Sequence, residues 1–202
     1  MNMSFEKDYF IQSEKSNYED YRDKKFDTLA NDLLRIIVLD SDAKILDFGC
    51  ATGGLLSSLK QRGYTRLKGT DISYWAVSYG KKYLGLEQEL EYHNVDLLTR
   101  DFDLILFLDV LEHVPSVSEI IQFLKLVRKG TRIIVRVPIS VKEGEPYMYE
   151  VSRNDATHVQ CHDAKWWDEL IGQCGYMEEI KIVGKAIYES EGVFARCYRR
   201  II

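Results

Sequence analysis

The sequence predicts a doubly wound α/β fold, with helices on both faces of a mainly parallel sheet. Strand-like and helix-like segments alternate five times, which is typical of this class. Two segments, 44–48 and 102–108, are short apolar runs of the kind found in strands that are buried on both faces. The first run breaks at Gly49 and resumes as a helical pattern near Thr52. Because glycines let a turn approach a ligand closely, we expect the ligand site at this turn.

The remaining elements follow from apolar periodicity and from the turn residues between them. Helices are expected, in order, at 25–39, 52–63, 74–84, 116–128 and 163–174. Strands are expected at 44–48, 66–70, 89–94, 102–108, 131–137, 176–183 and 192–200. In the last helix, Trp166, Leu170 and Ile171 are expected to face the core.

Length and composition fit a single domain that spans residues 1–202. The net charge of -5 argues against a nucleic-acid or acidic-membrane partner, and no apolar run is long enough to span a membrane. The polar N-terminus lacks the apolar segment of a secretory signal, so we expect a cytoplasmic location. The four cysteines are scattered without CxxC spacing, which argues against disulfides and a structural zinc site.

Two segments are candidates for covering the ligand. Residues 1–40 form a polar arm followed by the first helix. In this arm, Tyr9, Tyr18 and Tyr21 favour a lid, and the alternative is a solvated tail. Residues 138–161 lose all periodicity, and so long a loop inside a domain is more often functional than accidental. We expect this second segment to cover the substrate.

Acidic residues at the ends of neighbouring strands indicate a nucleoside-containing ligand. Asp71 closes the second strand and suits the two hydroxyls of a ribose. Asp96 follows the third strand and is expected to accept a hydrogen bond from an adenine amine. Leu97 or Ile72 is expected to pack against the ring. A dinucleotide and an adenosyl ligand both satisfy these positions.

The residues of the glycine turn distinguish between a dinucleotide and an adenosyl ligand. The dinucleotide fingerprint G-x-G-x-x-G has glycine at its third position, where this chain has Ala51. Asp47, on the strand before the turn, repels a pyrophosphate but helps to hold an ammonium group. The turn therefore favours an adenosyl ligand that carries positive charge.

Three motifs, in this order, resemble those of class I S-adenosylmethionine-dependent methyltransferases of the small-molecule type. Residues 45–54 read ILDFGCATGG and resemble the family's first motif. Residues 69–73 (GTDIS) resemble its acidic second motif, and 103–113 (DLILFLDVLEH) its fourth. The closing pattern is also similar, with His158 ahead of a helix and two final strands. The resemblance covers roughly 44–199.

The resemblance implies a seven-stranded sheet of order 3-2-1-4-5-7-6 with an antiparallel seventh strand. It also implies that S-adenosylmethionine is the cofactor and S-adenosylhomocysteine the product. Asp109 is expected beside the transferring methyl group, with a catalytic role. The residues expected around the cofactor are Asp47, Gly49, Cys50, Ala51, Gly53, Asp71, Ile72, Asp96, Leu97 and Leu108.

Methyl transfer from a sulfonium needs alignment and a nucleophile that has lost its proton. His158 is the expected general base, with Asp155 nearby to orient it, and a purely structural histidine is the alternative. His158, Cys161 and His162 lack the fourth ligand that a tetrahedral metal site needs, so no metal is expected.

We therefore expect methyl transfer to a hydroxyl, or an amine, of a small-molecule metabolite such as a sugar, a polyketide or a quinone-like compound. The Asn/Asp-Pro-Pro-aromatic run of DNA N-methyltransferases does not follow the fourth strand, so nucleic acid is not the expected substrate. A monomer or a homodimer is expected. Two alternatives are a non-catalytic S-adenosylmethionine-binding module and a nicotinamide-dependent oxidoreductase. The missing fingerprint and the lack of a Tyr-x-x-x-Lys helix disfavour the oxidoreductase.

Overall fold

Seven strands form one sheet in the order β3-β2-β1-β4-β5-β7-β6. β7 runs antiparallel to β5 and β6, and the other neighbouring pairs are parallel. The predicted order and the antiparallel seventh strand are therefore confirmed. This computed structural model describes residues 5–11, 21, 26–182, 187 and 190–202. The strands are β1 (Ile45–Phe48), β2 (Leu67–Asp71), β3 (Leu90–Tyr92), β4 (Leu104–Leu108), β5 (Arg132–Pro138), β6 (Tyr176–Lys181) and β7 (Val193–Arg200).

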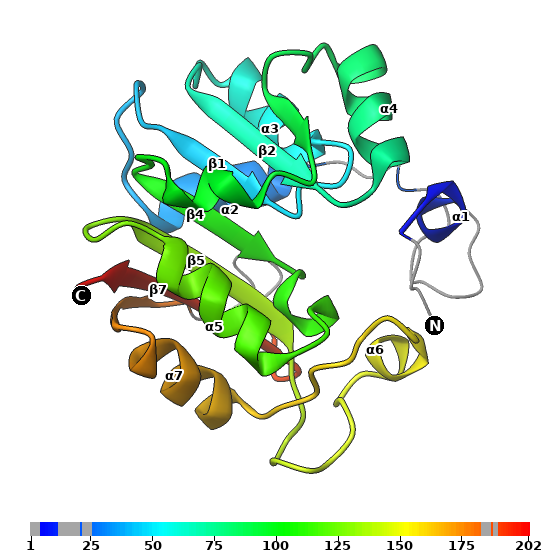
Figure 1. Cartoon of the computed structure of the whole chain (residues 1–202), viewed down its shortest axis with the longest axis vertical. Coiled ribbons are helices and arrows are strands. Elements are labelled where there is room, and N and C mark those ends of the chain that lie inside the picture. Colours follow the sequence, from blue (N-terminus) through cyan, green and yellow to red (C-terminus); the bar gives the residue numbers. More distant parts are fainter. Residues whose placement is uncertain (1–4, 12–20, 22–25, 183–186, 188–189) are drawn as a thin grey trace.

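Helices cover both faces of this sheet (Figure 1). One face packs against α2 (Asp27–Ile36), α3 (Gly54–Gln61) and α4 (Tyr74–Leu84), and the other against α5 (Val117–Leu126) and α7 (Ala164–Gln173). The 3₁₀ helices η2 (Val95–Thr99) and η3 (Leu111–His113) follow β3 and β4. The short helices α1 (Lys7–Phe10) and α6 (Glu150–Asn154) lie on the side toward which the parallel strands point.

The two halves of the core follow from the alternation of side chains along the strands. In β4, Ile105 and Phe107 join the cluster that packs against α5 and α7, whereas Leu104 and Leu106 join the cluster on the opposite face. All four are fully buried, as expected of a central parallel strand. β1 pairs with β4 along its whole length, so the turns after both strands open at the same rim of the sheet.

Most elements lie within a few residues of their predicted positions, and α4 spans 74–84 as predicted. The third strand is an exception, because β3 ends at Tyr92 rather than at Asn94. His93 takes a left-handed φ of 43°, which turns the chain out of the strand and toward η2. The predicted loop at 138–161 also differs from expectation, since it contains the helix α6.

The prediction for the core face of α7 is wrong at one position. Trp167, and not Trp166, is the fully buried tryptophan of this helix. Trp166 instead stacks on His162, with ring centroids 3.4 Å apart. Leu170 and Ile171 are buried as predicted. The two adjacent tryptophans point about 100° apart on a helix, so periodicity alone leaves open which of them faces the core.

Aromatic side chains attach the N-terminal arm to α4. Phe10 stacks on Trp75 with ring centroids 5.6 Å apart and contacts Tyr21 edge-on at 5.4 Å. Both Phe10 and Tyr21 are buried. Tyr18, which is part of the predicted lid, lies outside the described residues.

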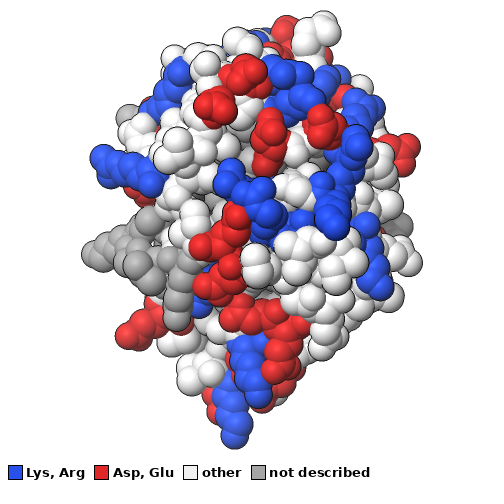
Figure 2. All heavy atoms as spheres, turned by 90° about the vertical axis from the view of Figure 1, so that its left-hand side faces the viewer, with Lys and Arg blue, Asp and Glu red and all other residues white. Residues whose placement is uncertain are grey.

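Charges of both signs are interspersed on the face that looks away from α1 and α6 (Figure 2). This mixture agrees with the modest net charge of -5. Among the described residues, none of the helices has the length and apolar character needed to cross a membrane.

Candidate active site

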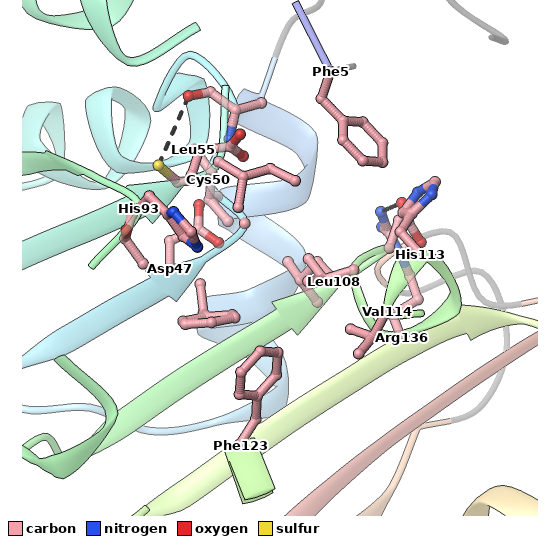
Figure 3. Close-up of a pocket in the computed structure, with 18 of the residues that line it drawn as sticks. Phe5, Asp47, Cys50, Leu55, His93, Leu108, His113, Val114, Phe123 and Arg136 are labelled. Carbon is pink, nitrogen blue, oxygen red and sulfur yellow. Dashed lines mark hydrogen bonds and ion pairs between the residues drawn. The ribbon is translucent and has the colours of Figure 1, made fainter. Parts of the chain in front are cut away.

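A cavity of about 220 Å³ lies at the rim where β1, β2 and β4 end, and we call it the first cavity. In Figure 3, Asp47, Cys50 and His93 lie on one side of it, and Phe5 and His113 lie on the other. Most of the residues predicted to bind the cofactor line this cavity. They are Asp47, Gly49, Cys50, Ala51, Asp71, Ile72 and Leu108, and Asp109, which is predicted to be catalytic, lines the cavity as well.

The glycine turn and the end of β2 are joined by hydrogen bonds. Gly49 has φ of +81°, and a Cβ there would overlap the side chain of Val110, so a larger residue does not fit. The N–H of Ala51 donates to Asp71 Oδ2 at 2.7 Å, and the N–H of Ser73 donates to Oδ1 at 2.8 Å. Burial raises the pKa of Asp71, and these two hydrogen bonds lower it. The Asp71 carboxylate is thereby fixed at the rim of the cavity.

Asp47 places a second carboxyl group in the first cavity. Its side chain is buried, and this burial raises its pKa to about 7. The negative charge of Asp71 acts in the same direction, whereas Arg136 lowers the pKa. A positively charged ligand in the cavity would therefore favour the ionised form of Asp47.

Three residues predicted to contact the cofactor do not line the cavity. Gly53 precedes α3 with φ of +77°, and a Cβ there would lie 2.7 Å from Leu86 Cδ1, so this glycine serves local packing. Leu97 is fully buried in the core, and Asp96 is exposed on η2.

The residues that take their place come earlier in the chain. His93, Asn94 and Val95 line the first cavity where Asp96 and Leu97 are expected. The sequence prediction extends β3 to Asn94, whereas β3 ends at Tyr92. The turn at His93 is the cause of this difference, and neither Gly nor Pro marks it in the sequence.

Aromatic residues of the N-terminal segment close one side of the first cavity. The arm is predicted to be a lid because it is rich in tyrosine. In the structure, phenylalanines line the cavity together with the tyrosines. The lining includes Phe5, Tyr9, Phe10, Tyr21 and Phe26.

Asp109 contacts an arginine of the neighbouring strand. Its backbone has φ of 57°, and its carboxylate pairs with Arg136 through both oxygens, with Nε to Oδ1 at 2.9 Å. The Arg136 side chain is 5% exposed, and its Nη1 donates to the carbonyl of Ile187 at 3.0 Å. Arg136 thus places a buried guanidinium beside the first cavity. Asp109, which is predicted to be catalytic, also has a structural function as the ion-pair partner of this arginine.

We expect Asp109→Ala to lower the free energy of unfolding by roughly 2–3 kcal/mol, because Arg136 then keeps its charge in a buried position without its carboxylate. Urea unfolding at pH 7 measures this change. Asp101→Ala is the matched control, since Asp101 pairs with Lys44 at the surface and such pairs contribute less than about 1 kcal/mol. Equal losses for both variants would contradict the prediction.

A second cavity of about 190 Å³ lies next to the first, and Tyr9, Asp109 and His113 belong to the walls of both. His158 lines this second cavity and not the first. The rest of its wall comes from η3, β5, β7 and the segment at 138–161, through Glu112, Pro138, Tyr149, Val151, Ser152, Asp155 and Val193.

His158 is held in one orientation. Its Nδ1 lies 3.0 Å from the carbonyl of Ser152, and because a carbonyl only accepts, Nδ1 carries the proton. Its Nε2 lies 3.7 Å from Asp155 Oδ2. Burial lowers the pKa of His158, and Asp155 raises it. The neutral imidazole therefore has an unprotonated Nε2, as a general base requires.

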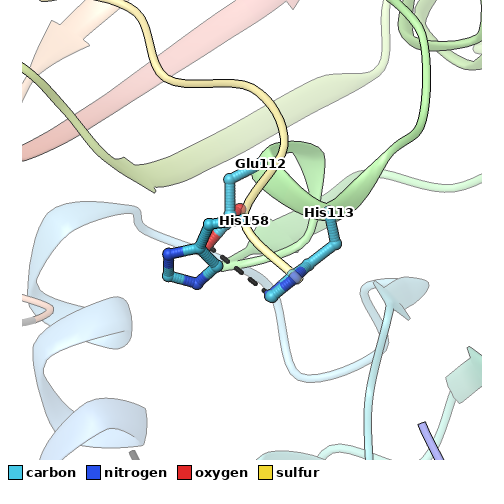
Figure 4. Close-up of side chains that lie close together, drawn as sticks. All are labelled: Glu112, His113 and His158. Carbon is cyan, nitrogen blue, oxygen red and sulfur yellow. Dashed lines mark ion pairs between the residues drawn. The ribbon is translucent and has the colours of Figure 1, made fainter. Parts of the chain in front are cut away.

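His113 packs edge-on against His158, with ring centroids 4.7 Å apart. Its Nδ1 lies 2.9 Å from the Thr157 hydroxyl and 3.2 Å from the Thr157 carbonyl, and because that hydroxyl donates to Asp155 Oδ1, Nδ1 carries the proton. Burial, and next the charge of His158, lower the pKa of His113 to about 4. Glu112 lies beside both rings and is fully buried, which raises the pKa of its carboxyl group (Figure 4). The sequence suggests only a structural hydrogen bond for His113. It singles out Glu112 only as a residue of the fourth motif.

Solved structures with this fold include three methyltransferases. The mitomycin 7-O-methyltransferase MmcR has a TM-score of 0.64 at 15% identity, with 87% of this chain and 54% of that chain covered. A SAM-dependent methyltransferase from Archaeoglobus fulgidus has 0.63 at 14%, with 86% and 94% covered. The magnesium protoporphyrin IX methyltransferase from Synechocystis PCC 6803, with bound SAH, has 0.61 at 18%, with 86% and 83% covered. This chain thus spans about half of the mitomycin enzyme.

Sequence comparison identifies the family. No curated protein sequence matches this chain. A family model described as a methyltransferase domain matches residues 18–177, which is most of the chain. The matched region contains the glycine turn, Asp71 and the segment at 138–161. The chain therefore belongs to the methyltransferase domain family.

Proposed function

We propose that this enzyme methylates a hydroxyl, or an amine, of a small-molecule metabolite that binds in the second cavity. The observation that supports this proposal is the pair of adjoining cavities with Tyr9, Asp109 and His113 in both walls. The first has the carboxylates and apolar surface that suit an adenosyl sulfonium compound. The second has groups that accept a proton. A methyl group at the shared wall would therefore face an acceptor in the second cavity.

The first cavity fits the proposed cofactor in its donor set and shape. Asp71 presents a carboxylate for the ribose hydroxyls, and Ile72 with the segment 93–95 offers a surface for the adenine. Gly49 leaves room beside the turn for the methionine portion. Asp47 adds negative charge near the cationic centre. When bound, S-adenosylmethionine supplies a methyl group on a sulfonium sulfur, which keeps the electron pair of the broken C–S bond as a thioether.

The residues of the chain would orient the acceptor and remove its proton. An oxygen lone pair of the acceptor forms the new bond to carbon, and the hydroxyl proton passes to an unprotonated nitrogen. His158 Nε2 supports this role by its tautomer and its place in the second cavity. Asp109 stands at the shared wall, where its pairing with Arg136 suits a positioning role.

A small acceptor agrees with the size and cover of the second cavity. Its volume is about 190 Å³, and residues of the segment 138–161 form much of its wall. Tyr9 donates to Asp155 Oδ2 at 3.2 Å, so the N-terminal arm and this segment meet above the site. We propose that both close over the substrate. The net charge of -5 supports a metabolite rather than a nucleic acid. The neighbour named for mitomycin acts, by its name, on a hydroxyl of a small molecule.

We expect Asp71→Ala to weaken binding of S-adenosylmethionine by roughly 1–3 kcal/mol, because it removes charge-assisted hydrogen bonds to the ribose. Calorimetry with S-adenosylmethionine and S-adenosylhomocysteine measures this loss. Asp96→Ala is the matched control and should bind as the parent does, since Asp96 is exposed and does not line the cavity.

Unchanged affinity of Asp71→Ala would remove Asp71 from the site, and a loss only in Asp96→Ala would restore the adenine contact predicted from sequence. Release of S-adenosylhomocysteine with a panel of hydroxylated metabolites then tests catalysis. Binding of the cofactor without turnover on any member of a broad panel would favour the non-catalytic module.

A further inference from the structure

Glu112, His113 and His158 form a cluster at the wall of the second cavity, which we call the EHH cluster (Figure 4). One donor atom from each of the three lies within 4.8 Å of the other two. The N–H groups of Val159 and Gln160 donate to the carbonyl of Glu112 at 2.8 and 3.1 Å. These bonds hold the loop that carries His158 against η3, although 45 residues separate the two histidines.

The two histidines share one tautomer. Each Nδ1 lies within hydrogen-bond distance of a backbone carbonyl, that of Thr157 for His113 and that of Ser152 for His158. Carbonyls only accept, and the Thr157 hydroxyl, which lies 2.9 Å from His113 Nδ1, donates to Asp155 Oδ1. Both Nδ1 atoms therefore carry protons, and both Nε2 atoms present lone pairs. Histidines that bind metals in proteins are held in this way, by donation of the second ring N–H to a backbone carbonyl or a carboxylate.

The buried side chain of Glu112 is a second observation, independent of the histidine tautomers, that points to a bound cation. Its side chain is fully buried, and among the described residues neither of its carboxylate oxygens has a hydrogen-bond donor. His113 Nε2 lies 4.0 Å from Oε1 and bears no proton in this tautomer. When Glu112 is ionised, three acceptors face one another with no donor between them in the described part of the chain, and a buried carboxylate without a partner is costly. A cation between them would satisfy all three.

We propose that the EHH cluster binds one divalent first-row transition metal ion through Glu112, His113 Nε2 and His158 Nε2. Two imidazoles and one carboxylate suit ions such as Zn²⁺, Fe²⁺, Co²⁺ or Mn²⁺, and three protein ligands leave coordination positions open toward the cavity. Asp155 and Asp109 add negative charge to the same wall, and Arg136 is paired with Asp109. The sequence predicts no metal, because the residues next to His158 that could bind one, Cys161 and His162, do not complete a tetrahedral site. The structure groups His158 with other ligands.

The proposed ion would deepen the proposed function, and this role depends on that function. The open positions face the cavity in which the acceptor is expected, so the acceptor hydroxyl oxygen would become a ligand. A bound ion lowers the pKa of such a hydroxyl, whose proton would pass to water in the cavity. With the ion in place, His158 Nε2 is a ligand, and the ion replaces this histidine as the group that promotes loss of the proton.

Metal binding can be measured without any methyl acceptor. The full chain is treated with a chelator, dialysed, and titrated with Zn²⁺ by calorimetry and with Co²⁺ by visible absorption. We expect one ion per chain and a Co²⁺ spectrum without a thiolate charge-transfer band. Glu112→Gln and His158→Ala should each weaken binding at least 100-fold. His162→Ala and Cys161→Ser are the controls and should bind as the parent does, because neither residue belongs to the EHH cluster.

Each outcome decides between the alternatives. No binding to the parent chain would overturn the proposal and leave His158 as the candidate base. Loss of binding in His162→Ala or Cys161→Ser would also overturn it, by placing the ion at the other group. If Glu112→Gln does not fold, His158→Ala provides the same test, with folding checked by circular dichroism. Ion binding without affinity for S-adenosylmethionine would support the metal site and count against the proposed function.

Discussion

Asp47→Asn is expected to raise the free energy of unfolding by about 4 kcal/mol above pH 8, which is unusual for a single substitution in a core. Burial, followed by the charge of Asp71, raises the pKa of Asp47 from 3.8 to about 7. The folded protein therefore bears the cost of an ionised, buried carboxylate at alkaline pH. Asparagine removes this cost, because it has nearly the same shape and no charge.

The pKa difference of Asp47 between the folded and unfolded states determines how the stability gain from Asp47→Asn changes with pH. Between pH 3.8 and about 7 the folded state binds a proton at Asp47 that the unfolded state has lost. The stability that protonated Asp47 provides is complete below the lower value and is lost as pH rises through the upper value. The gain from Asp47→Asn should therefore be small near pH 4, grow through this window, and be constant above it.

Urea unfolding of both proteins at pH 5 and at pH 8.5 measures this difference. Asp40→Asn is the control, since Asp40 is exposed and its replacement should change stability little at either pH. The same substitution should weaken binding of S-adenosylmethionine, because the cavity loses a carboxylate near the cationic centre. A variant with no gain in stability at pH 8.5 would show that Asp47 is not a buried charge.

Gly80→Ala should destabilise the protein by about 3 kcal/mol, although alanine is the better helix former by about 1 kcal/mol. Gly80 lies in α4, and a Cβ there would overlap the backbone carbonyl of Thr52 and approach Leu90 Cδ1 to 2.6 Å. Thr52 belongs to the glycine turn, whose backbone cannot move away without disturbing the first cavity. Affinity for S-adenosylmethionine should therefore fall together with stability.

Gly172→Ala is the matched control, because Gly172 lies in α7 with open space around its position. This variant should gain roughly 0.5–1 kcal/mol from helix propensity alone. Thermal melts and cofactor titrations of the two variants measure both effects. Similar behaviour of the two would show that α4 can shift on the turn at little cost.

The local pattern of residues predicted those features of the structure that depend on a single helix, strand or turn. The bounds of α4, the two faces of β4 and the open turn after β1 all follow from residue spacing and from glycine. The prediction is less accurate at the end of β3, where the left-handed His93 leaves no mark in the sequence. It also fails at Trp166 and Trp167, because adjacent helical residues differ only in the surface that the helix meets.

By itself, the sequence determined the fold class, the glycine turn and the carboxylate of Asp71 at the end of a strand, because each can be located from the local pattern of residues along the chain. Only the tertiary structure decided which distant groups meet. The pairing of Asp109 with Arg136 depends on β4 lying beside β5. The EHH cluster depends on a loop bound to η3 by two backbone hydrogen bonds. Such contacts arise from the order of strands and the path of loops, which residue periodicity does not encode.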